Sequence, residues 1–94
     1  MRVLTSEQAR EDLQEIYDYI SADNPEAADR VLARIVEIIG LLAAGAFEGR
    51  TVRLSDGRAV QVWAARPYRI YYRVSNGALE VIRIYHQARR SIEK

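Results

Sequence analysis

The side chains best suited to chemistry lie in the last third of the chain, between Trp63 and Arg90. Arginines there could hold phosphate or carboxylate, because the planar guanidinium can donate to two oxygens at once. A histidine, two tyrosines and a glutamate could carry a proton. Phosphodiester transfer needs both kinds of group: a base, an acid, and cations for the charge that develops. The cations are Arg69, Arg73, Arg83, Arg89 and Arg90, and the proton carriers are Tyr71, Glu80, Tyr85 and His86.

Several of these residues also have an ordinary structural interpretation. His86 stands at the end of a predicted strand, where a histidine commonly serves structure. Arg73 would pair with Glu80 across a hairpin, and Arg69 could pair with an acid on the first helix. Arg89 and Arg90 have the weakest structural reason to be present, since no predicted core needs two adjacent charges.

Charge is divided unevenly along the chain. Residues 1–48 hold four arginines and ten acids, a net charge of −6, whereas residues 49–94 hold nine arginines, one lysine and three acids, a net charge of +7. We therefore expect a basic working surface on the C-terminal half, suited to an acidic partner or to nucleic acid.

Composition excludes several classes of protein. The 94 residues, 49% hydrophobic and 29% charged, predict one domain over residues 1–94. Without cysteine there is no disulfide or thiolate metal site, and a single histidine argues against zinc. No apolar run approaches the roughly 20 residues of a membrane span, and polar residues follow Leu4 too soon for a secretion signal. We expect a cytoplasmic protein with no metal and no cofactor.

The clearest structural signal is a β-hairpin. The runs Tyr68–Val74 and Leu79–Tyr85 flank Asn76-Gly77, a pair that favours a type I′ turn. This turn would pair Val74 with Leu79, and a regular ladder then assigns each side chain to a face. One predicted face holds Tyr68, Ile70, Tyr72, Val74, Leu79, Val81, Arg83 and Tyr85; the other holds Arg69, Tyr71, Arg73, Glu80, Ile82, Ile84 and His86.

Two amphipathic helices are predicted before the hairpin. Thr5-Ser6-Glu7-Gln8 reads as a capping box with Thr5 as the N-cap residue. Asn24-Pro25 begins the second helix, with Asn24 as N-cap and Pro25 at the first helical position. Apolar residues recur at helical spacing behind both signals.

Short strands complete the predicted fold. We expect strands at Arg2–Leu4, Thr51–Leu54 and Arg58–Trp63, and a polar tail from His86 to Lys94. The fold class is α+β: an N-terminal strand, then a helical hairpin packed on a three- to four-stranded, mainly antiparallel sheet.

The order and spacing of short motifs resemble the RelE/ParE superfamily of small toxins from bacterial toxin–antitoxin pairs, over nearly the whole chain. The motifs are A-x-x-D-L-x-x-I-x-x-Y-I at Ala9–Ile20, N-P-x-x-A at Asn24–Ala28, an I-x-x-I-x-x-L stripe ending at Leu41 and Leu42, G-R at Gly57-Arg58, Y-R-I-x-Y at Tyr68–Tyr72 and I-x-x-x-H-x-x-R at Ile82–Arg89. The resemblance implies a growth-inhibiting protein neutralised by a cognate antitoxin, whose C-terminal segment wraps around it.

The resemblance allows two targets. RelE-like members cut mRNA in the ribosomal A site, using basic residues and, in several, a C-terminal tyrosine. ParE-like members bind and poison DNA gyrase without that catalytic set. Here Lys94 is the only lysine and no tyrosine follows Tyr85, so the chain is closer to the ParE-like, plasmid-stabilisation branch. A third interpretation is a degenerate member that binds its antitoxin and operator DNA but is not toxic.

The resemblance places Arg69 and Arg89 where RelE-like enzymes keep functional arginines, and the other expected site residues are chosen for their charge or aromatic character. A gyrase inhibitor of this family needs no catalytic residue. The resemblance implies a tight complex with the antitoxin, and contact with operator DNA only through the antitoxin. No membrane partner is expected. An mRNA nuclease would instead use Arg69, His86 and Arg89. The expected target-binding residues are Arg69, Arg83, His86, Arg89 and Arg90; the expected antitoxin-binding residues are Tyr17, Trp63, Tyr71 and Tyr85.

Overall fold

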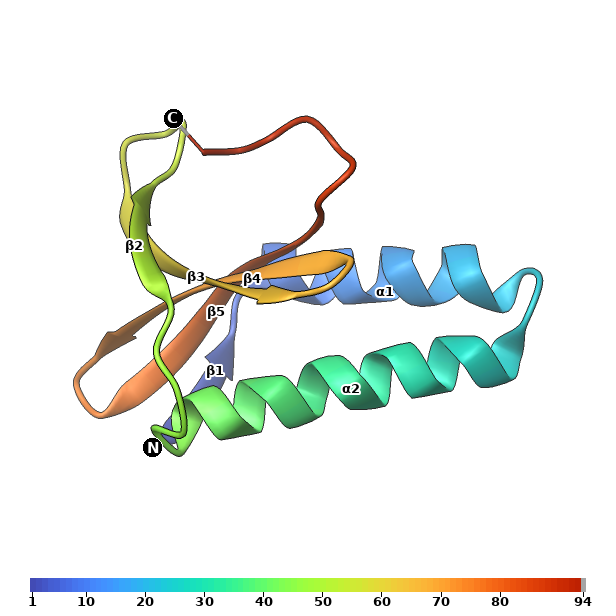
Figure 1. The fold of residues 1–94 in the computed structure, drawn as a ribbon, viewed down its shortest axis with the longest axis horizontal. Helices are drawn as coiled ribbons and strands as arrows, with labels where there is room; N and C mark the ends of the chain where they lie inside the picture. The colour runs from blue at the N-terminus through green and yellow to red at the C-terminus, as the bar shows by residue number, and fades with distance from the viewer. Residues whose placement is uncertain (94) are drawn as a thin grey trace.

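Two helices lie against one face of a five-stranded sheet in the computed structural model, which describes residues 1–93 (Figure 1). The sheet order is β1-β5-β4-β3-β2, with β1 parallel to β5 and every other pair antiparallel. The elements are β1 (Arg2–Thr5), α1 (Glu7–Ser21), α2 (Pro25–Ala43), β2 (Arg50–Arg53), β3 (Ala59–Ala65), β4 (Tyr68–Ser75) and β5 (Ala78–His86). The predicted fold class is confirmed, with one strand more than expected.

The two helix starts differ in how well local sequence predicted them. Asn24 caps α2 as expected: its side chain accepts a hydrogen bond of 3.1 Å from the Ala27 N–H. The N-cap of α1 is Ser6, which accepts from the Ala9 N–H at 3.0 Å, so the assignment to Thr5 was wrong. Thr5 still belongs to β1 and pairs with Val81, which delays the start of the helix by one residue.

The hairpin of β4 and β5 has the predicted turn but not the predicted regular ladder. Asn76 and Gly77 have φ angles of 53° and 71°, as a type I′ turn requires, and Val74 pairs with Leu79. Beyond the pair of Tyr72 with Val81, a bulge makes Tyr71 pair with Arg83. The bulge adds one residue to β5, so the faces predicted for residues 83–86 were wrong.

Each face of the sheet carries an apolar cluster. The larger lies beneath the helices and includes Ile35, Ile70, Leu79 and Ile84. The smaller lies on the outer face, and its buried members are Leu54, Val60, Val62, Tyr71 and Ile82. Ile84 therefore faces the helices rather than sharing a face with Tyr71, because the bulge reverses the alternation.

The C-terminal tail, residues 87–93, is not a free polar extension. Figure 1 shows it leaving β5 and returning towards the β2–β3 connection. There the Ser55 N–H donates to the Ile92 carbonyl at 2.7 Å, Glu93 forms a β-bridge with Leu54, and Ile92 packs on the outer cluster. The prediction of a polar tail from His86 to Lys94 was therefore wrong at two residues, since His86 belongs to β5 and Ile92 packs on the outer cluster; residue 94 lies outside the described residues.

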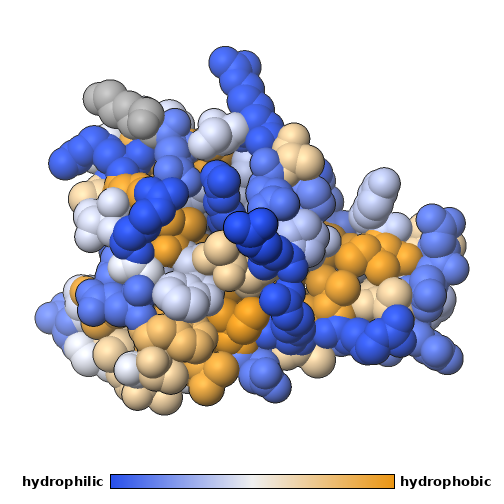
Figure 2. Space-filling model, in the orientation of Figure 1, coloured by the Kyte–Doolittle hydropathy of each residue, from blue (hydrophilic) through white to orange (hydrophobic). Residues whose placement is uncertain are grey.

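The surface is mixed in character. Figure 2 shows hydrophilic side chains over much of the view, with apolar surface in the seam between α1 and α2 and near the N-terminus. Val3, Leu4 and Val36 are among the exposed apolar side chains. Within residues 1–93, no helix is long and apolar enough to cross a membrane.

Candidate functional site

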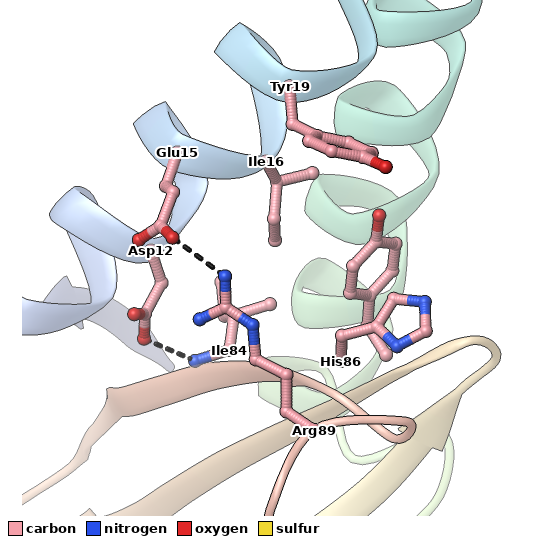
Figure 3. A pocket seen from close by; sticks show the side chains of 8 residues that line it. Asp12, Glu15, Ile16, Tyr19, Ile84, His86 and Arg89 are labelled. Atoms are coloured by element: carbon pink, nitrogen blue, oxygen red, sulfur yellow. Dashed lines mark hydrogen bonds and ion pairs between the residues drawn. The ribbon is translucent and has the colours of Figure 1, made fainter.

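A pocket of about 310 Å³ lies between α1 and the C-terminal end of β5 (Figure 3). Figure 3 shows Asp12 and Glu15 pointing from α1 towards the sheet, with Arg89 reaching back to Glu15. The bulge in β5 brings His86 to this side of the sheet. The lining residues are Asp12, Glu15, Ile16, Tyr19, Tyr68, Ile84, His86 and Arg89.

The start of α1 completes the edge of β5 where β1 ends. β1 pairs with β5 only as far as Val81. The Ser6 N–H donates to the Val81 carbonyl at 3.0 Å, and the Ser6 hydroxyl donates to the Ile82 carbonyl at 2.8 Å. Asp12 then accepts from the Ile84 N–H at 2.9 Å. Ser6, through its backbone and side chain, and the Asp12 carboxylate thus replace the strand that is missing beside the bulge.

Asp12 and Arg83 form the ion pair at the back of the pocket. Nε and Nη2 of Arg83 donate to the two carboxylate oxygens of Asp12 at 2.8 and 3.0 Å. Asp12 is 8% exposed, so its charge is compensated by three donors rather than by water. The hydrogen bond to Asp12 also raises the pKa of Arg83. Arg83, an expected target-binding residue, therefore joins β5 to α1 through its ion pair with Asp12.

Arg89 and Glu15 form the exposed rim of the pocket. The Nη2 of Arg89 lies 2.7 Å from the Glu15 carboxylate, and this hydrogen bond raises the pKa of Arg89. The guanidinium carbons of Arg83 and Arg89 lie 5.3 and 5.9 Å from the centre of the Tyr85 ring, within cation–π range. The Tyr85 ring therefore contacts both arginines.

His86 presents only one ring nitrogen for further contacts. Its Nδ1 accepts a hydrogen bond of 3.0 Å from the Ala88 N–H, which places the proton of the neutral ring on Nε2. The ring meets Tyr68 edge to face, with centroids 5.3 Å apart, and burial raises the pKa of Tyr68. Both carboxylates of the pocket are already paired with arginines. The arrangement can hold a polar or aromatic group, but it places no unpaired carboxylate beside His86.

The three residues expected of an mRNA nuclease do not converge. His86 and Arg89 line the pocket beside α1, whereas the guanidinium of Arg69 lies 3.5 Å from Glu93 in the tail. The partner of Arg69 is therefore Glu93 and not an acid of the first helix; the buried acid of that helix, Asp12, pairs with Arg83. Arg90 is exposed on the tail.

The residues expected to bind an antitoxin are also dispersed. Tyr17 is half-buried on α1, and Trp63 stacks on Phe47 with ring centroids 4.2 Å apart, covering the edge of the main core. Tyr71 is buried in the outer cluster and Tyr85 packs against it. An antitoxin could reach Tyr71 only after the tail had moved.

Sequence reasoning missed the contribution of α1 to the pocket. Asp12, Glu15 and Tyr19 follow one another at intervals of three and four residues, which places them on one side of the helix. That spacing was available in the sequence, but two acids and a tyrosine on a charged helix also fit an ordinary solvated face. Their partners on β5 and the tail show that this side of α1 faces the sheet.

Metal binding has no support in this geometry. Among residues 1–93, no three His, Cys, Asp or Glu side chains gather closely enough to hold a metal ion. The groups that meet at the pocket are instead two ion pairs, two tyrosines and a histidine.

Comparison with known proteins identifies the family. The sequence model described as "ParE toxin of type II toxin-antitoxin system, parDE" matches residues 3–91. A Sinorhizobium fredii protein named "Putative toxin Y4kP" is 40% identical over 74 residues, which cover 79% of this chain and 75% of that protein. The solved structure "Chromosomal ParDE TA system from P. aeruginosa" is similar at a TM-score of 0.71 and 28% identity, over 92% of this chain and 95% of that one. The chain belongs to the ParE toxin family of type II toxin–antitoxin systems.

Proposed function

We propose that this ParE-family toxin arrests growth in the cytoplasm by binding DNA gyrase, with no reaction of its own, and that a cognate antitoxin neutralises it by binding first. Family membership supplies the class of protein, and the relative from P. aeruginosa is described as a ParDE system. In this proposal the antitoxin, not the toxin, carries the complex to operator DNA.

The main observation that argues against mRNA cleavage is the separation of Arg69 from His86 and Arg89. Cutting RNA requires an acid, a base and a cation to act on one phosphate. Arg69 contacts Glu93, whereas His86 and Arg89 lie at the pocket, where Arg89 is paired with Glu15. This arrangement supports a protein that acts by binding. We place gyrase recognition at His86 and Arg89 of the pocket and at the neighbouring exposed Arg90 of the tail, with Arg83 holding α1 against β5.

A supercoiling assay tests the proposal directly. Purified gyrase should supercoil relaxed plasmid less well when the toxin is added, and mixing the toxin with its antitoxin beforehand should restore supercoiling. A translation reaction programmed with a defined mRNA serves as the parallel assay. Normal supercoiling together with mRNA cut at the ribosomal A site would replace this proposal with nuclease activity. Normal results in both assays would identify a non-toxic member.

A further inference from the structure

The tail places a carboxylate of the protein itself among basic residues on the outer face of the sheet. The hydroxyl of Tyr71 donates to Glu93 at 2.8 Å, and guanidinium nitrogens of Arg69 and Arg50 lie 3.5 and 3.7 Å from the same carboxylate. The Glu93 side chain is only 18% exposed. We call Arg50, Arg69 and Tyr71 the outer-face anion site.

Two strands, β4 and β2, supply the residues of this site. Arg69 and Tyr71 are two residues apart on β4, so their side chains leave the same face of the sheet. Arg50 comes from β2, two strands away. Burial and the nearby Glu93 charge raise the pKa of Tyr71, so its hydroxyl stays protonated and able to donate. Two cations and one neutral donor therefore face a single position.

Glu93 makes only some of the hydrogen bonds that the outer-face anion site could donate. Its one hydrogen bond in the site comes from Tyr71, because the two arginines stand beyond ordinary hydrogen-bond distance. The Arg50 and Arg69 side chains remain 67% and 37% exposed, and exposed ion pairs contribute little to stability. A carboxylate seated more closely could accept paired hydrogen bonds from an arginine. The tail is thus a ligand that another segment could displace.

The neighbourhood of Glu93 indicates what kind of segment would fit. Ile92 covers the apolar cluster, and its carbonyl accepts from the Ser55 N–H at 2.7 Å. A replacement must therefore be extended, with an aliphatic residue followed by an acidic one. Phosphate from a nucleic acid could satisfy the arginines, but it brings no aliphatic group to cover Leu54 and Val60.

We propose that the outer-face anion site binds an extended aliphatic–acidic segment of a partner protein, and that Ile92 and Glu93 occupy this site in the free toxin. The intramolecular tail competes with the partner. The apparent affinity for the partner is therefore the intrinsic affinity multiplied by the fraction of molecules whose site is open. This inference does not depend on which enzyme the toxin inhibits.

Peptide binding to the full-length protein tests the competition. The probe is a fluorescent peptide with the sequence of residues 87–93 and an amidated end, so that its glutamate is the only carboxylate. Fluorescence anisotropy should show Glu93→Ala binding this probe at least about 10-fold more tightly than the unmodified protein, because the competing carboxylate is gone. Glu80→Ala is the control, since Glu80 pairs with Arg73 elsewhere on the hairpin.

Two further comparisons establish the chemistry of the site. In the Glu93→Ala background, Arg69→Ala should weaken binding about 10-fold or more, whereas Arg73→Ala, on the same strand, should leave it unchanged. A probe with glutamine in place of glutamate should bind the Glu93→Ala protein about as weakly as the glutamate probe binds the Glu93→Ala/Arg69→Ala protein. Equal affinity of Glu93→Ala and the unmodified protein, or indifference to the probe's glutamate, would overturn the proposal. Tighter binding of single-stranded oligothymidylate than of the probe would assign the site to phosphate instead. The assay contains no gyrase, so its failure leaves the supercoiling result to stand separately.

Discussion

Asp12 on α1 and Arg83 on β5 form a two-bond ion pair, although 71 residues separate them in the chain. The same carboxylate accepts from the Ile84 N–H, so one side chain joins the helix to both a side chain and the backbone of the strand. Because this pair stands behind the pocket and next to the bulge, it links the geometry of the proposed target surface to the stability of the fold.

Asp12→Ala should destabilise the protein strongly. Removing one partner of a buried ion pair costs about 3–5 kcal/mol, and the partial exposure of Arg83 reduces the expected loss to about 2–3 kcal/mol. Urea unfolding monitored by circular dichroism measures it. Glu15→Ala, on the same helix, is the matched control: it breaks the exposed pair of Glu15 with Arg89 and should cost much less than Asp12→Ala. Equal losses in the two variants would contradict the role given to Asp12.

Alkaline pH should weaken the fold through Tyr68 and Tyr71. Burial raises the pKa of both hydroxyls above their ordinary 10.0, and the Glu93 charge adds to the effect at Tyr71. The unfolded chain then loses these protons at lower pH than the folded chain. Stability is therefore complete below about pH 10 and falls as pH rises from there through the folded pKa values. Melting temperatures between pH 8 and 11 measure the loss.

Tyr71→Phe should reduce this alkaline loss, because one of the two buried ionisations is removed. Tyr19→Phe should leave it unchanged, since Tyr19 is 82% exposed. A pH profile of Tyr71→Phe identical to that of the unmodified protein would show that Tyr71 ionises as freely in the folded state as in the unfolded chain.

The double variant Arg89→Ala/Arg90→Ala should fold but lose toxicity. Both residues are exposed, and the ion pair lost between Arg89 and Glu15 is a surface pair that contributes little to stability. Growth after induction measures toxicity, and thermal melting of the antitoxin complex checks folding. Arg10→Ala/Arg30→Ala removes the same charge from exposed helix positions and should remain toxic. Full toxicity of the tail variant would move the target surface away from the pocket rim.

Two glycines should respond to alanine in opposite directions. Gly77 has a φ of 71° in the β4–β5 turn, so Gly77→Ala should cost about 1 kcal/mol or more of unfolding free energy. Gly40 lies within α2 with nothing within 4 Å of an added Cβ, so Gly40→Ala should stabilise by about 0.5–1 kcal/mol. Chemical denaturation of both variants tests the turn and the helix separately; a stabilised Gly77→Ala variant would exclude the left-handed turn.

Local sequence determined the features of this protein that depend on near neighbours. Asn24-Pro25 starts a helix because a side-chain oxygen and a missing N–H both suit its first turn. Asn76-Gly77 reverses the chain because both positions tolerate positive φ. These signals and the apolar spacing were enough for the fold class, because each is carried by residues close together in the chain. The order of the motifs along the chain then indicated the family.

Only the tertiary structure decided how those elements meet. The capping residue of α1 depends on how far β1 follows β5, since Thr5 pairs with Val81 and leaves the cap to Ser6. The bulge in β5 is also visible only in the assembled sheet: its extra residue turns the Ile84 side chain towards the main core, and the Ile84 N–H donates to Asp12.

The position of Glu93 has the same origin. Nothing near it in the sequence indicates that it lies against Tyr71, because that contact exists only once β2, β4 and the tail are assembled. Short-range patterns report which conformation a segment prefers, whereas ion pairs between distant segments depend on register and packing, which the whole fold sets at once.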